Sequence, residues 1–459
     1  MPEKSLQSLA LNTDLYELTM AAGYFENNLN AKATFEMFIR ELPNNRAFLV
    51  SAGLEQIVEY LLNLKFEMED ISYLKNLSSF KHVSNNFFEY LNDLSFSGDI
   101  WAIPEGEIFY PGEPLLRVTA PIIEAQIIET YLLSMLNFQS LVASKSARVI
   151  QAANFDSVHR GVMEFGSRRA HGPEASILAA RASYIAGCIG TSNVLAGKKF
   201  NIPVFGTAAH SWTLAFESEV KAFEAYQKVF PDSTVLLIDT FDIEQGIKNA
   251  IQLKKDFRGV RIDSGDLLEC SRMVRKILDE NNHEKVIIIV SGDLNEYKIK
   301  ELVENKAPIN SFGVGTQMVT SEDAPSLSGI YKLVEIEKSG KKQYKAKFSE
   351  DKATYPAKKQ VYRITDEKGN YLKDIIGLTN EEINEKHETL LKEIIKNGKL
   401  EYQFPELTDV QTGFLQKLEK LNKKYKQFKK PEKYPIEYSE NLQRLFETLK
   451  EEEFKQTAQ

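Results

Sequence analysis

The chain has few of the residues and segments that mark several common protein classes. It carries two cysteines in 459 residues, Cys188 and Cys270, and no Cys-x-x-Cys pair, which disfavours a disulfide framework and a structural zinc site. No stretch reaches the roughly 18 uncharged apolar residues that span a bilayer, and the first residues lack the apolar core of a signal peptide. The composition therefore predicts a cytoplasmic protein with no membrane partner.

An excess of positive charge is also missing. The formal net charge is −8, from 57 Lys and Arg against 65 Asp and Glu, which argues against a nucleic-acid partner. Local arginines can still bind small anionic ligands in a net negative protein. With 43% apolar and 27% charged residues, the chain has the composition of a globular protein of two or three domains.

Three zones with different patterns follow one another along the chain. Residues 1–135 mix helix-like and strand-like stretches and predict an N-terminal α+β domain. Residues 136–360 alternate short apolar runs, polar turns and amphipathic helices, which is typical of an α/β domain with a parallel sheet or barrel. Residues 361–459 are rich in Lys and Glu and predict a charged accessory region with helices at 388–395 and 441–453.

The apolar runs of the middle zone predict its strands. They are 162–165, 185–189, 202–205, 235–238, 260–262, 286–290 and 311–314. Glycine, serine, threonine, aspartate or arginine residues follow nearly every run, whereas packing alone would require only one or two glycines for turns. Because ligands bind at the carboxyl ends of strands in parallel α/β folds, these residues predict a ligand site along one sheet edge.

Residues 206–212 read Gly-Thr-Ala-Ala-His-Ser-Trp and follow one of these runs. Small residues let backbone amides approach a phosphate closely, and an imidazole can accept a transferred phosphoryl group. A single histidine after a strand is more often a hydrogen-bonded structural residue. The polar residues at the other strand ends favour the functional interpretation of His210.

Taken in order, these strand ends resemble those of the nicotinate phosphoribosyltransferases. The similar segments are 13–20, 164–169, 190–193, 206–212, 238–242, 261–266, 312–315 and 331–335. The resemblance implies an enzyme of NAD salvage that forms nicotinate mononucleotide and pyrophosphate from nicotinate and phosphoribosyl pyrophosphate, coupled to ATP hydrolysis through a phosphohistidine. With the zones above, the predicted fold is α/β: an incomplete TIM-like α/β barrel of the type II phosphoribosyltransferase kind, with an N-terminal α+β domain and a C-terminal helical extension.

The resemblance assigns four catalytic positions. It makes His210 the residue phosphorylated by ATP and Asp239 the carboxylate that orients the imidazole, leaving its other nitrogen to attack. Asp239 also precedes a helix, where N-capping is the alternative role, although Asp242 fits that role better. Arg261 and Asp263 match the positions for phosphate and ribose, since a guanidinium grips phosphate oxygens and a carboxylate accepts from vicinal hydroxyls.

Further strand ends are predicted to bind the substrates. Phe165 and Arg168 resemble the family's nicotinate-facing pair, a stacking ring and a cation. Glycine-bearing loops after the late strands are expected to hold the 5′-phosphate through backbone amides. The other predicted binding positions are Thr207, Gly265, Gly292, Asp293, Gly313, Gly315 and Thr316.

Two further predictions concern base choice and assembly. The related nicotinamide-using enzymes carry an aspartate where Ser192 stands, and an aspartate would repel the nicotinate carboxylate. Ser192 therefore predicts nicotinate over nicotinamide, the alternative being an ordinary turn or N-cap residue. Asp14 and Tyr16 resemble positions that the family supplies from a partner subunit, which implies a homodimer with a shared active site. The alternative is that Tyr16 and Leu15 simply lie on an amphipathic helix.

The chemistry also predicts cofactors. Because pyrophosphate leaves as a polyanion, Mg²⁺ is expected, held mostly by substrate oxygens and water and with no protein ligand named. The resemblance implies ATP as a co-substrate. A metal-dependent barrel hydrolase using His159, His171 and His210 is the alternative enzyme class. It is disfavoured because no His-x-His or His-Glu-x-x-His pair is present. A binding protein with an inactive barrel is a third possibility that no motif supports.

Overall fold

The computed structural model describes residues 9–349 and 353–457 and divides the chain into two compact units. Unit 1 comprises Met1–Ser140, Ser326–Glu406 and Gln416–Gln459, and unit 2 comprises Leu141–Pro325 and Leu407–Leu415. The sequence-based division at 135 and 360 follows chain order. Unit 1 instead combines the first and last parts of the chain, because strands from both pair in the same sheet.

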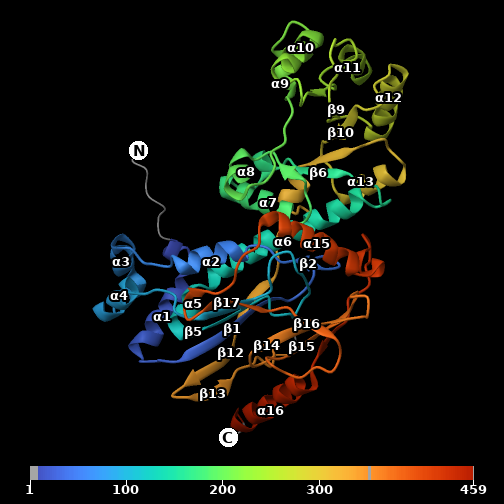
Figure 1. Ribbon diagram of the computed structural model, residues 1–459. Helices are drawn as coiled ribbons and strands as arrows, with labels where there is room; N and C mark the ends of the chain where they lie inside the picture. Colours follow the sequence, from blue (N-terminus) through green and yellow to red (C-terminus); the bar gives the residue numbers. More distant parts are fainter. Residues whose placement is uncertain (1–8, 350–352, 458–459) are drawn as a thin grey trace. The chain divides into compact units, whose positions relative to one another are not determined.

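Unit 2 is built on a parallel sheet (Figure 1). Within the described residues, its six strands lie in the order β7-β6-β11-β10-β9-β8, and every pair is parallel. Their bounds are β6 (Gly161–Glu164), β7 (Gly190–Thr191), β8 (Val235–Leu237), β9 (Gly259–Ile262), β10 (Ile287–Val290) and β11 (Ser311–Val314). Parallel pairing brings all the carboxyl ends to one edge, as the sequence predicts.

Helices follow these strands, and several begin with a side-chain cap. They are α7 (Pro173–Ile185), α8 (Val194–Phe200), α9 (His210–Leu214), α10 (Glu219–Val229), α11 (Ile243–Ala250), α12 (Leu267–Glu280), α13 (Glu296–Glu304) and α14 (Thr316–Val319). Figure 1 shows α10, α11 and α12 beside one another, and neighbouring helices of this group are in contact. At the start of α11, Asp242 accepts a hydrogen bond from the Gln245 N–H. Asp242 is therefore the cap of this helix, and Asp239 is not.

Two predicted strands of unit 2 are wrong, whereas the other five runs contain strands. Residues 185–189 hold the end of α7 and a turn in which Gly187 has a φ of +107°. The sheet strand begins only at Gly190. Residues 202–205 contribute one isolated bridge, from Thr191 to Val204. Pro203 has no N–H to extend that pairing.

Unit 1 contains an antiparallel sheet in the order β13-β12-β1-β5-β3-β17-β18. Its strands are β1 (Lys32–Ile39), β3 (Asp99–Ala102), β5 (Leu116–Pro121), β12 (Gly329–Lys338), β13 (Lys341–Tyr344), β17 (Lys392–Lys396) and β18 (Lys399–Leu400). A second sheet has the order β16-β14-β15-β19, with β14 (Lys359–Thr365), β15 (Tyr371–Leu378), β16 (His387–Thr389) and β19 (Ile436–Tyr438). The short strands β2 (Leu49–Val50) and β4 (Ile108–Phe109) pair with each other.

Most helices of unit 1 lie in the first part of the chain. They are α1 (Leu15–Glu26), α2 (Leu54–Leu62), α3 (Met68–Lys75), α4 (Asn85–Asn92), α5 (Ile122–Ile127) and α16 (Glu440–Thr457). The helices α6 (Glu129–Ala153) and α15 (Leu407–Lys420) each contain a boundary between the units. Four short 3₁₀ turns, Leu9–Leu11, Ser78–Phe80, Ser167–Arg169 and Lys423–Lys426, complete the described elements.

The C-terminal region is not the helical extension that the sequence predicts. Residues 388–395 form parts of β16 and β17, although α16 confirms the helix predicted at 441–453. Leu390, Leu391, Ile394 and Ile395 are buried. Their i, i+4 spacing fits one face of a helix, but β17 pairs with β3, and this long-range pairing decides the local conformation.

A buried ion cluster joins α6, α13 and the segment after α14 within unit 2. The Lys145 Nζ lies 2.6 Å from Glu296 Oε2 and 2.8 Å from Asp323 Oδ1, and Arg148 Nε donates to Glu296 Oε1 at 3.0 Å. The Lys145 and Glu296 side chains are 1% and 0% exposed. Although burial raises the pKa of Glu296, the cations Lys145 and Arg148 hold it below its ordinary value. The cluster therefore keeps Glu296 ionised in the interior.

The substitution Lys145→Met is expected to lower the free energy of unfolding by about 3–5 kcal/mol, because it takes from the buried Glu296 carboxylate one of the cations that pair with it. The matched control is Lys248→Met, which breaks the exposed pair with Glu244 and should change stability by about 1 kcal/mol or less. Urea unfolding measures both. Equal effects of the two substitutions would contradict a stabilising role for the buried cluster.

Candidate active site

The residue predicted as nucleophile lies beside its predicted partner. His210 is the first residue of α9, and its Nε2 lies 3.1 Å from Asp239 Oδ1. The imidazole is 41% exposed, whereas the carboxylate is 0% exposed. Asp239 Oδ2 accepts from the Asp263 N–H at 2.9 Å and from Ser264 Oγ at 2.6 Å. The carboxylate is thus held in place on one side and presents its other oxygen to an accessible imidazole.

Arg261 is the centre of a second polar group at the same edge. Its Nη1 donates to Thr207 Oγ1 at 2.6 Å, its Nε to Ser291 Oγ at 2.9 Å and its Nη2 to Asp263 Oδ1 at 3.0 Å. Ser291 Oγ also donates to Asp263 Oδ1. Although burial raises the pKa of Asp263, Ser291, Arg261 and His210 together hold it below its ordinary value. Asp263 therefore remains an anion that can accept hydroxyl groups.

The glycines at the strand ends allow close approaches that a side chain would prevent. A Cβ on Gly313 would lie 2.5 Å from the Phe165 ring, and one on Gly315 would lie 3.2 Å from the Phe165 carbonyl oxygen. A Cβ on Gly292 would lie 2.1 Å from the Asp263 carbonyl oxygen, and Gly292 has a φ of +94°. Gly292 and Gly313 are thus needed to bring neighbouring strand ends together.

Glu164, in the last position of β6, supports two of these strand ends, a role that the sequence analysis missed. Its carboxylate accepts from the Gly166 N–H and from Thr191 Oγ1, and its backbone carbonyl accepts from the Ser192 N–H. Burial raises the pKa of Glu164. The residue itself stands in a segment that resembles the family, but no sequence signal gives its contacts. Ser291, directly after β10, was missed too, although its hydroxyl follows the pattern of the other strand ends.

Several predicted residues have no partner that would fix their side chains. Within the described part of the chain, the Arg168 guanidinium forms no ion pair, and the Ser192 hydroxyl makes no hydrogen bond. Asn193, and not Ser192, caps α8, since its side chain accepts from the Ala196 N–H. This finding removes the N-cap alternative for Ser192. The predicted positions Gly265 and Asp293 have positive φ values of +83° and +41°, and Thr316 is the first residue of α14.

Asp14 and Tyr16 belong to unit 1. Asp14 precedes α1 and accepts a hydrogen bond from Thr130 Oγ1 at 3.1 Å. Tyr16 lies in the first turn of α1 and is 46% exposed. Burial together with Glu129 and Glu17 raises the pKa of Tyr16, so its hydroxyl remains protonated. Tyr16 and Leu15 both lie on α1, as the amphipathic-helix alternative holds, and both remain about half exposed within unit 1, which leaves the Tyr16 ring accessible.

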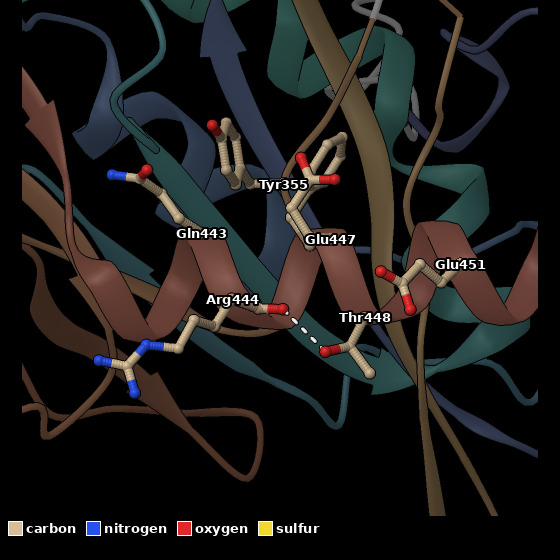
Figure 2. Close-up of a pocket in the computed structure, with 7 residues that line it drawn as sticks. Tyr355, Gln443, Arg444, Glu447, Thr448 and Glu451 are labelled. Carbon is tan, nitrogen blue, oxygen red and sulfur yellow. Dashed lines mark hydrogen bonds between the residues drawn. The ribbon is translucent and has the colours of Figure 1, made fainter.

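A groove elsewhere in unit 1 has no relation to the predicted residues. Its volume is about 440 Å³, and Figure 2 shows Tyr355 beside one face of α16. The lining residues are Tyr355, Gln443, Arg444, Phe446, Glu447, Thr448 and Glu451. Across the described ranges, no group of three or more His, Cys, Asp or Glu could hold a metal ion. In the same ranges no helix is long and apolar enough to cross a bilayer.

Comparisons with known proteins agree with this geometry. Residues 11–137 match the nicotinate phosphoribosyltransferase N-terminal domain, 161–374 the family domain and 383–446 the C-terminal domain. The chain is 45% identical to a nicotinate phosphoribosyltransferase of Mycobacterium tuberculosis over 85% of this chain and 82% of that protein. It is 40% identical to the Bacillus subtilis enzyme of the same name over 96% of both chains. The crystal structure of human nicotinic acid phosphoribosyltransferase covers 95% of this chain and 99% of its own, with a TM-score of 0.84 and 28% identity.

The parallel sheet and its strand-end residues define a type II phosphoribosyltransferase-like α/β protein. The crystal structure of nicotinate-nucleotide pyrophosphorylase from Pyrococcus furiosus is similar at a TM-score of 0.73 and 28% identity, over 90% of this chain and 96% of that one. The matched domains and identities then give the family: the chain belongs to the nicotinate phosphoribosyltransferases and is an enzyme. This confirms the family inferred from the strand ends and excludes the hydrolase alternative.

Proposed function

We propose that this enzyme joins nicotinate to phosphoribosyl pyrophosphate, releasing nicotinate mononucleotide and pyrophosphate, and couples the reaction to ATP hydrolysis through phosphorylation of His210. The observation that carries the proposal is the accessible His210 on the buried Asp239, next to the Arg261 and Asp263 group. We also propose that the sheet is an incomplete barrel, since β7 and β8 end it without pairing with each other.

The phosphoryl transfer follows from the orientation of the imidazole. Asp239 accepts the Nε2–H, so the lone pair of His210 resides on Nδ1. In our proposal Nδ1 attacks the terminal phosphorus of ATP, an N–P bond forms, and the bond to the ADP oxygen breaks. Water later hydrolyses the N–P bond. The buried carboxylate stabilises the imidazolium character that develops as Nδ1 gives up its electron pair.

The glycosyl transfer requires no general base in this proposal. The pyridine nitrogen of nicotinate has a free lone pair, which forms the new bond to the ribose carbon as pyrophosphate departs with the electrons of the old bond. Asp263 would accept the ribose hydroxyls, and Arg261 would neutralise phosphate charge, so that both act through positioning and electrostatics. Since the described residues form no metal-binding group, we propose that Mg²⁺ is held mainly by substrate oxygens and water.

The substitution Asp239→Asn should reduce ATP-dependent stimulation at least about 100-fold, as a misplaced proton removes the attacking lone pair. Asp239 Oδ2 already accepts two hydrogen bonds, so the asparagine oxygen takes that position and its NH₂ faces His210. The imidazole must then accept at Nε2 and carry its proton on Nδ1. Phosphoprotein formed from radiolabelled ATP measures the effect, with His210→Ala as the null control. Full labelling of Asp239→Asn would contradict the assignment.

Base choice tests the function as a whole. The protein is expected to consume phosphoribosyl pyrophosphate with nicotinate and not with nicotinamide. The substitution Ser192→Asp should lower kcat/KM for nicotinate at least about 100-fold, because like charges in a closed site cost on the order of several kcal/mol. The matched substitution Ser192→Asn introduces a side chain of the same size as aspartate but without its charge, and it should lower kcat/KM for nicotinate much less. Equal losses in both variants would show that Ser192 does not read the charge of the base.

We also propose a homodimer in which Asp14 and Tyr16 complete the partner's pocket. The exposed ring of Tyr16 supports this assignment. Mixed dimers of Tyr16→Ala and His210→Ala chains should regain part of the activity that each variant lacks alone, since one of the two shared pockets is then intact. Activity of isolated and co-expressed mixed dimers measures the recovery. Verified mixed dimers without recovery would contradict a shared site.

A further inference from the structure

The carboxylate of Glu17 is buried beneath the first turn of α1, which also holds Tyr16 and follows Asp14. Glu17, in the first turn of α1, is 0% exposed. Thr13 Oγ1 lies 2.5 Å from its Oε2 and Thr130 Oγ1 lies 2.5 Å from its Oε1, while the Thr130 N–H donates to Oε1 at 3.0 Å. All these residues belong to unit 1. The function derived above makes no use of Glu17.

The hydroxyl groups of Thr13 and Thr130 each have one hydrogen to donate but two acceptor oxygens within reach. The Thr130 hydroxyl has one hydrogen, but both Glu17 Oε1 and Asp14 Oδ2 lie within hydrogen-bond distance of its oxygen. When Glu17 is ionised, the hydrogen can serve only one of the two carboxylates. When Glu17 is protonated on Oε1, it donates to Thr130 Oγ1, and Thr130 then donates to Asp14. A proton on Oε1 therefore provides the hydrogen that the Thr130 side of the cluster lacks, whereas Thr13 remains shared between Oε2 and the Ile127 carbonyl oxygen.

The surroundings of Glu17 favour uptake of this proton near neutral pH. Burial, with the nearby Glu129 carboxylate, raises the pKa of Glu17 to about 7, against the opposing hydrogen bonds from Thr13 and Thr130. The titratable groups around Glu17 are Asp14 before α1, Tyr16 on α1, Tyr60 on α2, Glu129 at the start of α6 and Tyr331 on β12. Lys332 acts on Glu129, and Glu124 on the adjacent α5 is bonded to Ser97. Of these groups only Lys332 is a cation.

We propose that Glu17 and Thr130 form a protonation switch that holds Asp14, and with it the first turn of α1, in the orientation that binds the pyridine substrate. The inference rests on the proposed function, in which Asp14 and Tyr16 complete the nicotinate pocket. As pH rises, Glu17 releases its proton to solvent and the Thr130 O–H turns from Asp14 to Glu17. Asp14 then loses a donor, and the pocket binds nicotinate less well.

The experiment compares KM for nicotinate and kcat between about pH 6 and pH 8, on either side of the Glu17 pKa. In the unsubstituted protein the KM should rise roughly two- to tenfold, the effect of one hydrogen bond, with a smaller change in kcat. Glu17→Gln is neutral at every pH, and its oxygen takes the Oε1 position because the Thr130 N–H donates there. The Thr130 O–H then favours the charged Asp14 carboxylate over an amide oxygen, so the KM of this variant should stay low and flat. Thr130→Val cannot donate to Asp14, so its KM should stay high and flat.

The matched control is Thr13→Val, which removes the other hydroxyl of the cluster. Thr13 Oγ1 is shared between Glu17 Oε2 and the Ile127 carbonyl oxygen and does not reach Asp14, so this variant should retain the pH-dependent KM. A Glu17→Gln profile that rises as in the unsubstituted protein would overturn the switch. The switch would also be overturned if the KM of Thr13→Val stayed flat with pH while the KM of Thr130→Val rose.

A second measurement is independent of turnover. Because the folded-state pKa of Glu17 lies above its unfolded value of about 4.5, its contribution to stability is present below about pH 4.5 and is lost as pH rises through about 7. Urea unfolding of Glu17→Gln should lack this loss, and identical pH dependence in both proteins would overturn the switch. Absence of turnover with nicotinate in the unsubstituted protein would instead contradict the proposed function and leave this stability result unaffected.

Discussion

The candidate site depends on the parallel pairing of the six strands of unit 2, β6, β7, β8, β9, β10 and β11. In a parallel ladder all carboxyl ends meet at one edge, so short polar segments that are distant in the chain become neighbours. The insertion of β11 between β6 and β10 places Gly313 against the Phe165 ring. The pairing of β9 with β10 likewise brings Ser291 to Arg261 and Asp263. Each contact requires the strand order as well as the residues themselves.

The polar groups of the site hold one another in place. Arg261 is held by three acceptors, and Asp239 by a backbone N–H and a serine hydroxyl. Fixed dipoles and charges of this kind stabilise developing charge without reorganising during the reaction. Arg168 and the Ser192 hydroxyl, in contrast, have no fixed partner among the described residues. The rigid part of the site is thus the one proposed for phosphate and ribose, and the unpaired part is the one proposed for the base.

Much of unit 2 could be predicted because its signals are local. Short apolar runs gave five strands of the sheet, and Asp242 gave the start of α11. The errors arose where tertiary pairing overrides a local pattern. Residues 185–189 are apolar enough for a strand but hold the last residue of α7 and the turn after it. The apolar pairs within 388–395 fit a helix, but β17 pairs with β3. The contacts of Glu164 and Ser291 gave no comparable signal, because a hydrogen-bond partner on another strand leaves no trace in the local sequence.

The sequence by itself determined the family, and it predicted which residues carry the chemistry and the edge of the sheet to which they belong. The family and these predictions follow from which residue types stand at the strand ends and from the order of those ends along the chain. Only the tertiary structure decided that His210 meets Asp239 through Nε2, that Arg261 is shared among Thr207, Ser291 and Asp263, and that Thr130 lies between Glu17 and Asp14. Distance and direction determine which hydrogen serves which acceptor, and neither exists until the strands and helices have packed.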